Sequence, residues 1–111
     1  MKISFRHYHQ KAKLNFKMLH VTKANYLKDY QVEVSFNDGK TGTADLHQAL
    51  TGSVFEPMKD IKIFSQLKVD KELDTIVWPN GADLAPEYLY FQAFKEIPEL
   101  QDKFRKWGYI A

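Results

Sequence analysis

The sequence contains no cysteine among its 111 residues, which excludes a disulfide framework and a thiolate zinc site. It also lacks any apolar run near the roughly 18 residues that a membrane span requires. The N-terminal stretch MKISFRHYHQKAK has no apolar segment of the kind found in signal peptides. Together these absences predict a cytoplasmic protein that makes no membrane contact.

Signs of catalysis are equally sparse. No serine lies in a nucleophile elbow, there is no glycine-rich phosphate loop, and no nucleophile accompanies His47. His7 and His9 would share one face of a strand, but their basic surroundings repel a cation, so we expect no metal site. We therefore expect no catalytic residue, cofactor or small-molecule ligand. A small enzyme with a pocket near Asn80 and Asp83 is the least favoured alternative.

What the sequence does have is enough apolar material for one folded domain and an uneven charge distribution. It is 44% hydrophobic and 14% aromatic, and its net charge is +2. Residues 1–28 hold seven Lys or Arg and no acid, whereas the remainder holds nine against fourteen acids, a net −5. A basic segment therefore precedes an acidic body. It is either a solubilising tail, a phosphate-binding segment, or a segment that folds back on the body.

Residues 1–19, the first part of this basic segment, form a basic N-terminal arm. The loose alternation of apolar and polar residues in the arm also allows it to be an edge strand. Phe5, Tyr8 and Phe16 are interleaved with the basic residues, a mixture that can bind nucleic acid through phosphate contacts and stacking. This gives the alternative function of a nucleic-acid-binding or autoregulatory protein. The residues that would carry it are Lys2, Arg6, Lys11, Lys13 and Lys17.

Three successive strands are predicted at 20–27, 31–36 and 41–46. The second alternates cleanly between apolar and polar residues, and Asp38-Gly39 signals a hairpin with a type I′ turn before the third. Strands joined in this order need no crossover helix, so they form an antiparallel meander.

Two short helical segments should follow the meander. The first, 45–52, has Asp45 and Gln48 as a capping box and Gly52 as its stop. The second, 56–67, is expected to break at Asp60. Its predicted core-facing stripe consists of Met58, Ile61 and Phe64.

Two further strands are predicted at 68–70 and 74–79. The second begins the most distinctive stretch of the sequence, TIVWPNGADLAPEYLY at 75–90. Pro79 ends strand pairing, and Asn80-Gly81 is expected to supply left-handed backbone for a reversal. Because each feature has a structural cause, an architectural corner is favoured over an active site. Its residues are Trp78, Pro79, Asn80, Gly81 and Asp83.

A helix should begin at Pro86 and run to about Glu96, with apolar residues in nearly every direction around its axis. The aromatic surplus predicts a contact surface for a protein partner or a second copy. Its residues are Tyr88, Tyr90, Phe91 and Phe94. In the alternative, the last helix covers this surface with Leu100, Phe104 and Trp107.

These patterns define an α+β fold: a mostly antiparallel meander with short helices on one face and a C-terminal helical pair. We expect residues 20–97 to form one domain, with 98–111 as a helix packed on it. The function that these patterns favour is that of a non-enzymatic protein-interaction module.

Several motifs, in order, resemble the bacterial family called domain of unknown function 2442 over about residues 20–91. The most specific is VWPNGADL at 77–84, supported by F-x-D-G at 36–39 and F-x-P-M-K-D at 55–60. The resemblance implies a compact α+β domain and an antitoxin-like role beside a neighbouring small protein. It assigns no catalytic residue. Ala85 replaces the Asp common before Pro86, which removes a helix cap worth about 1 kcal/mol.

Overall fold

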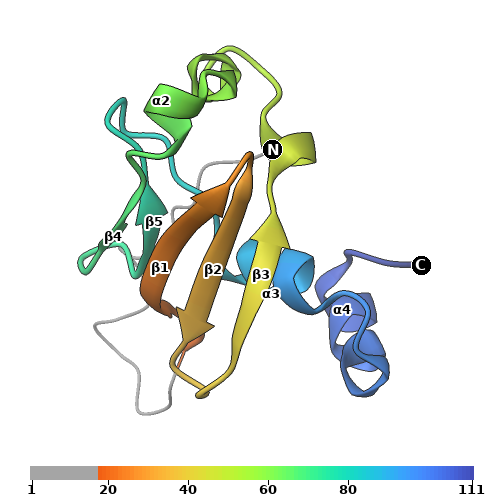
Figure 1. Ribbon diagram of the computed structural model, residues 1–111. Helices are drawn as coiled ribbons and strands as arrows, with labels where there is room; N and C mark the ends of the chain where they lie inside the picture. Colours follow the sequence, from red (N-terminus) through yellow and green to blue (C-terminus); the bar gives the residue numbers. More distant parts are fainter. Residues whose placement is uncertain (1–17) are drawn as a thin grey trace.

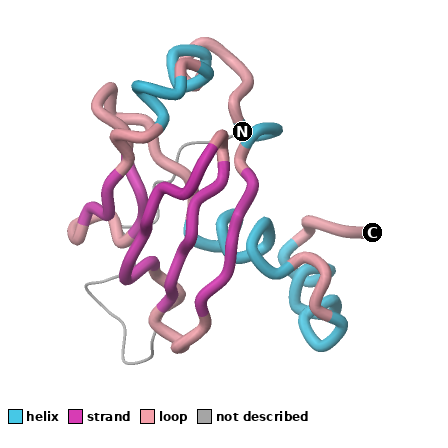
Figure 2. The backbone as a smooth tube through the Cα atoms, viewed as in Figure 1, coloured by secondary structure: helices cyan, strands magenta, loops and turns pink. Residues whose placement is uncertain are grey.

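The computed structural model describes residues 18–111, so most of the predicted basic arm lies outside the described residues. Figures 1 and 2 show a strand meander with a second, small sheet beside one edge and helices behind and around it. In chain order the elements are β1 (Val21–Lys28), β2 (Gln31–Phe36), β3 (Thr41–Asp45), η2 (His47–Ala49), η3 (Glu56–Lys59), α2 (Ile61–Phe64), β4 (Lys68–Asp70), β5 (Thr75–Val77), α3 (Pro86–Phe94), η4 (Pro98–Leu100) and α4 (Gln101–Trp107).

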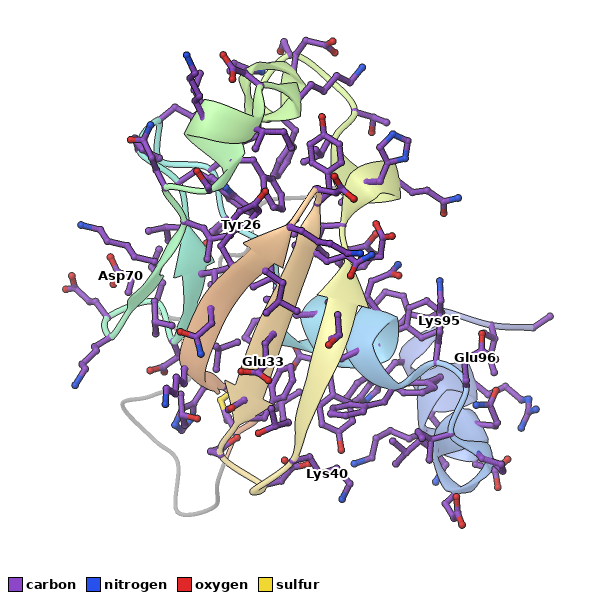
Figure 3. All side chains as sticks on the ribbon, in the orientation of Figure 1. Tyr26, Glu33, Lys40, Asp70, Lys95 and Glu96 are labelled. Carbon is purple, nitrogen blue, oxygen red and sulfur yellow. The ribbon has the colours of Figure 1, made fainter. Side chains whose placement is uncertain are left out.

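The meander β1-β2-β3 is antiparallel and its two faces differ in polarity. Val32, Val34 and Phe36 of β2 are at most 2% exposed, because they face the core. The opposite face is polar, and there Asn25 Nδ2 donates to Glu33 Oε1 at 3.3 Å. Figure 3 shows Glu33 on the face turned away from α3. The alternation predicted for this strand is thus confirmed.

The turn between β2 and β3 is not the predicted type I′ turn. Gly39 N donates to Phe36 O and Phe36 N donates to Lys40 O, each at 3.0 Å. Gly39 has φ +88°, whereas Asp38 is not in the positive-φ region. This is a three-residue loop, in which a type I turn ends at a left-handed glycine. Asp38 Oδ1 accepts from the Lys40 amide at 2.9 Å, at the C-terminal end of the loop.

The second sheet, β4-β5, lies beside the outer edge of β1 (Figure 1). It is connected to that edge by the Val21 amide, which donates to Asp74 O at 2.9 Å. Within the β4-β5 turn, Asp70 Oδ1 accepts from the amides of Glu72 and Leu73 at 2.8 and 3.1 Å. The predicted pair of short strands is confirmed.

The segment from 45 to 64 is less helical than predicted. The expected first helix is only the 3-10 turn η2, although Asp45 Oδ1 does accept from the His47 amide at 3.0 Å. The predicted break at Asp60 is present, and its carboxylate accepts from Lys62 N at 2.9 Å at the start of α2.

The predicted apolar stripe of this segment is wrong at one position. Met58 and Phe64 are fully buried, but Ile61 is 38% exposed. The break at Asp60 separates η3 from α2, so a helical spacing of three residues does not continue across it. Ile61 therefore does not follow Met58 on the same face.

The C-terminal helices close the core on the buried face of the meander. α3 begins at Pro86 as predicted and packs against β3 and β2, ending two residues before the predicted Glu96. α4 carries the fully buried Phe104, and Gly108 ends it with φ +87°. None of the helices in residues 18–111 is long and apolar enough to cross a membrane. The predicted α+β architecture is confirmed.

Candidate functional site

The stretch from Trp78 to Asp83 is a tightly closed corner. Trp78 N donates to Ala82 O and Gly81 N donates to Trp78 O, each at 2.9 Å. Only Gly81 has a positive φ, +88°, so the prediction of left-handed backbone is wrong for Asn80. Asn80 contributes its side chain instead: Nδ2 donates to Val54 O at 2.9 Å and Oδ1 accepts from Ala82 N at 3.1 Å.

Two buried side chains next to the corner, those of Trp78 and Thr75, donate hydrogen bonds to backbone carbonyls. Trp78 is 2% exposed, and its Nε1 donates to Phe64 O at 2.9 Å. Thr75 Oγ1 donates to Leu84 O at 2.6 Å, while Asp83, 1% exposed, pairs with Val77 in an isolated β-bridge. The hydrogen bonds of the corner therefore join loop, strand and helix, while Pro79 stays exposed at the tip.

Of the four aromatic residues predicted as a contact surface, the structure buries two and leaves two partly exposed. Tyr90 and Phe94 are 1% and 9% exposed, because α3 turns them toward β2 and β3. Both pack on Phe36, with ring centroids 5.0 and 5.9 Å away. The prediction that these two are surface residues is corrected by this burial. Tyr88 and Phe91 are half-buried and retain accessible surface.

Tyr90 links α3 to the hairpin loop through its hydroxyl, which donates to Asp38 Oδ2 at 2.7 Å. Lys103 Nζ lies 5.5 Å from the Tyr90 ring centroid. Partial burial acts to raise the pKa of Asp38, but the Tyr90 and Lys40 hydrogen bonds and the charges of Lys40 and Lys103 outweigh it and lower that pKa. Burial and the adjacent carboxylate raise the pKa of Tyr90, so it remains a donor at neutral pH.

A half-buried aromatic cluster covers the other side of the helical pair. Phe91 and Tyr109 stack with centroids 5.0 Å apart and planes 13° apart, and Tyr109 also approaches Tyr88 and Trp107 at 6.0 and 6.4 Å. Burial raises the pKa of Tyr88, whose hydroxyl oxygen accepts from Gln92 Nε2 at 3.0 Å. We call Tyr88, Phe91, Trp107 and Tyr109 the aromatic cluster.

The point where the basic arm joins the body is held by Asn37. Its Nδ2 donates to Met18 O at 2.7 Å, its Oδ1 accepts from His20 N at 2.9 Å, and its amide donates to His20 O at 3.0 Å. The sequence predicted no role for Asn37. Only its place in the hairpin loop could have suggested a local role, because the partner residues lie 17 and 19 positions earlier.

A cavity of about 380 Å³ opens beside this junction, between the start of β1 and the β4-β5 hairpin. It is lined by His20, Val21, Thr22, Val69, Lys71 and Asp74. The predicted nucleic-acid residues Lys2, Arg6, Lys11, Lys13 and Lys17, and the His7–His9 pair, lie outside the described residues. Within residues 18–111, no three His, Cys, Asp or Glu side chains gather in a way that could hold a metal ion.

Comparison with known proteins supplies a related fold. The crystal structure named "Putative DNA Binding Protein", from Nitrosomonas europaea ATCC 19718, matches with a TM-score of 0.64 and 12% sequence identity. The match covers 89% of this chain and 66% of that one, so this chain spans slightly less than two thirds of that protein. At this identity the likeness shows the fold alone. A search of curated proteins gave no match.

The family comparison agrees with the motifs of the corner and the hairpin. The family described as "Protein of unknown function (DUF2442)" matches residues 21–95, which run from the first residue of β1 to one residue past the end of α3. This range includes the VWPNGADL corner and extends four residues beyond the predicted 20–91. The chain belongs to the DUF2442 family.

Proposed function

We propose that this protein binds nucleic acid through its basic N-terminal segment, residues 1–28. The observation that carries the proposal is the charge division: this segment has seven Lys or Arg and no acid, and the other residues have a net charge of −5. Phosphates are attracted to the first part and repelled by the second. Binding is therefore oriented, with the acidic body held away from the nucleic acid.

The last part of this segment belongs to the folded body. Lys23 and Lys28 are exposed on β1, and the adjacent β4-β5 hairpin exposes Lys68 and Lys71. The hairpin also carries Asp70, Glu72 and Asp74, so its own net charge is −1. The cations that continue the basic segment onto the body are therefore Lys23 and Lys28 of β1.

The solved structure with a similar fold supports the proposal through its name, which concerns DNA. Because a third of that protein has no counterpart here, the support is for the class of ligand and not for a particular surface. On this chain, phosphate contact and stacking by Phe5, Tyr8 and Phe16 are sequence-independent interactions. The proposed binding is accordingly non-specific and sensitive to salt.

Fluorescence anisotropy with a labelled duplex of about 20 base pairs at low salt tests the proposal. In the arm variant, Lys2, Arg6, Lys11, Lys13 and Lys17 are changed to Gln. The matched control changes four exposed lysines and one exposed arginine of the body to Gln: Lys59, Lys62, Lys95, Arg105 and Lys106. We expect the arm variant to lose at least tenfold in affinity and the control to lose much less. Equal losses, or no binding by the wild type, would overturn the proposal.

A second function is favoured by the aromatic cluster. Its four rings are half-buried, and amphipathic aromatic side chains of this kind are enriched at protein interfaces. We propose as second candidate that this cluster binds the product of a neighbouring gene, as an antitoxin-like partner would. Co-purification of the two products should succeed for wild type and fail for Tyr88→Asp with Tyr109→Asp. Absence of a complex with wild type would contradict this candidate.

A further inference from the structure

The outer edge of β3 presents a row of backbone groups that no strand of residues 18–111 pairs. At the two ends of the β2-β3 ladder, Phe36 N donates to Lys40 O at 3.0 Å and Leu46 N donates to Tyr30 O at 2.9 Å. In an antiparallel pair, alternate residues direct both backbone groups to the same neighbour. Residues 40, 42, 44 and 46 therefore bond to β2. Thr41, Thr43 and Asp45 direct their N–H and C=O groups outward.

The opposite edge of the meander is protected, as exposed edges in natural proteins usually are. β1 carries two irregularities in its register and two exposed lysines, Lys23 and Lys28. It also lies beside the β4-β5 hairpin and is bonded to it through Val21. These features make addition of a strand to β1 unfavourable.

The β3 edge has none of these protections. Its register with β2 is regular, and it contains no lysine and no proline. Figure 1 shows β3 as the outermost strand on its side of the meander, with α3 packed on its face and not along its edge. The one charge on the strand is Asp45. An unprotected edge of this kind is a template for pairing with another strand.

We propose that β3 pairs with β3 of a second copy of this chain, antiparallel and around a two-fold axis at Thr43. In this register Thr43 faces Thr43 of the second copy, and Thr41 faces Asp45. Because the three outward-directed residues are symmetric about Thr43, each facing pair exchanges two backbone hydrogen bonds. The two meanders become one continuous sheet.

Side-chain chemistry favours a second copy in this register. The proposed pairing places the Asp45 carboxylate opposite the Thr41 hydroxyl, and a threonine opposite a threonine, both of which are favourable cross-strand pairs. A register that brought the two Asp45 side chains together would oppose like charges. On the opposite face, the intervening residues Gly42 and Ala44 pack on α3 of the same chain, so the join is formed by the strand edge and by the side chains of Thr41, Thr43 and Asp45.

Sedimentation velocity of the full chain over a concentration series tests this proposal. Thr43→Pro removes the central outward donor while the bonds to β2 remain, because a proline is tolerated where its nitrogen faces outward. We expect wild type to dimerise and Thr43→Pro to raise the dissociation constant at least tenfold. Thr43→Val keeps the amide and the strand propensity, so this control should dimerise as wild type does.

Thr43→Lys is the second variant, because it leaves the backbone unchanged and places two lysines opposite each other at the axis. Circular dichroism verifies that each variant is folded. Dimerisation should survive Tyr88→Asp, which separates this interface from the aromatic cluster. A monomeric wild type at all concentrations would overturn the proposal. So would folded Pro and Lys variants that dimerise as tightly as wild type.

Discussion

At the scale of single residues, Tyr90 has a buried ring and a hydroxyl that bonds to a residue of an exposed loop. Its ring lies among Phe36, Phe94 and Phe104, with centroids at 5.0, 4.7 and 6.3 Å. Its hydroxyl reaches Asp38 in the exposed hairpin loop. An aromatic residue with a polar tip can bury its ring and still satisfy its hydroxyl. Tyr90 is therefore a structural residue that fixes the loop to α3.

Tyr90→Phe isolates the hydroxyl, because the buried ring is retained. We expect the free energy of unfolding at pH 7 to fall by about 0.5–1 kcal/mol, the lower part of the range for a hydrogen bond since Asp38 is exposed. The pKa of Asp38 should rise toward its ordinary value. NMR titration of the Asp38 carboxyl and urea denaturation measure the two effects.

The same hydrogen bond predicts a pH dependence. Because folding lowers the pKa of Asp38 from 3.8, the carboxylate stabilises the fold above that value. The stabilisation is lost as the pH falls through the lowered pKa. The stability difference between wild type and Tyr90→Phe should thus shrink below about pH 4. A difference that is constant from pH 7 to pH 2 would contradict this assignment.

Gly81 is the residue at which the corner demands a left-handed backbone. Its φ is +88°, and no atom lies within 4 Å of the place a Cβ would occupy, so a side chain there meets strain but no steric clash. Gly81→Ala should therefore cost about 1–2 kcal/mol, and Gly81→Asn less. Thermal denaturation measures this, since each kcal/mol lowers Tm by about 4–8 °C in a domain of this size. If Gly81→Ala were as stable as wild type, the left-handed backbone at this position would not strain a residue with a side chain.

At the scale of elements, α3 lies so near β3 at Gly42 that no side chain would fit there. A Cβ at this position would lie 2.6 Å from Phe94 Cε1 and 3.3 Å from Ala93 Cβ. Gly42 therefore sets how near α3 lies to β3. The absence of one side chain on the strand makes room for a buried ring on the helix.

Gly42→Ala should push α3 away from the sheet and destabilise the fold by about 1–3 kcal/mol. Phe94→Leu, which removes the ring that would be struck, should recover part of that loss in the double variant. Urea denaturation of the two single variants and the double variant gives the coupling. Strictly additive effects would mean that the two residues do not limit the approach of α3.

Elements with a strong local signal could be predicted from the sequence, and the details that depend on distant partners could not. Alternation found β2, and Pro86 fixed the start of α3. The turn type at Asp38 was missed because the loop length follows from the register of the flanking strands. The burial of Tyr90 and Phe94 was missed because it depends on which side of α3 meets the sheet. The contacts of Asn37 join residues that are remote in sequence.

The site predictions follow the same division. The left-handed backbone of Gly81 could be predicted because glycine acts on its own backbone. The bond from Asn80 Nδ2 to Val54 O could not, because Val54 lies 26 positions earlier. Two of the four predicted contact residues, Tyr88 and Phe91, do keep accessible surface. Trp107 and Tyr109, which complete the aromatic cluster, come from the last helix and the residues after it. Only the packing of α4 on α3 brings them together.

At the scale of the whole molecule, the chain separates charge along its length. The described body contains all fourteen acids, and the basic arm enters it at Met18 and His20, where Asn37 holds the backbone. The body then presents three surfaces: cations on β1, the outer edge of β3, and the aromatic cluster on the helical pair. The sites proposed for nucleic acid, a second copy and a protein partner therefore use different residues.

The most direct test of nucleic-acid binding by the arm is the salt dependence of the association constant for a DNA duplex. Each phosphate contact contributes about −0.9 to the slope of log K against log salt concentration. The wild type should therefore give a slope of about −4 if most of the arm cations engage phosphates. The variant with glutamine at all five positions should give a slope much closer to zero. The same slope for both proteins would contradict binding through the arm.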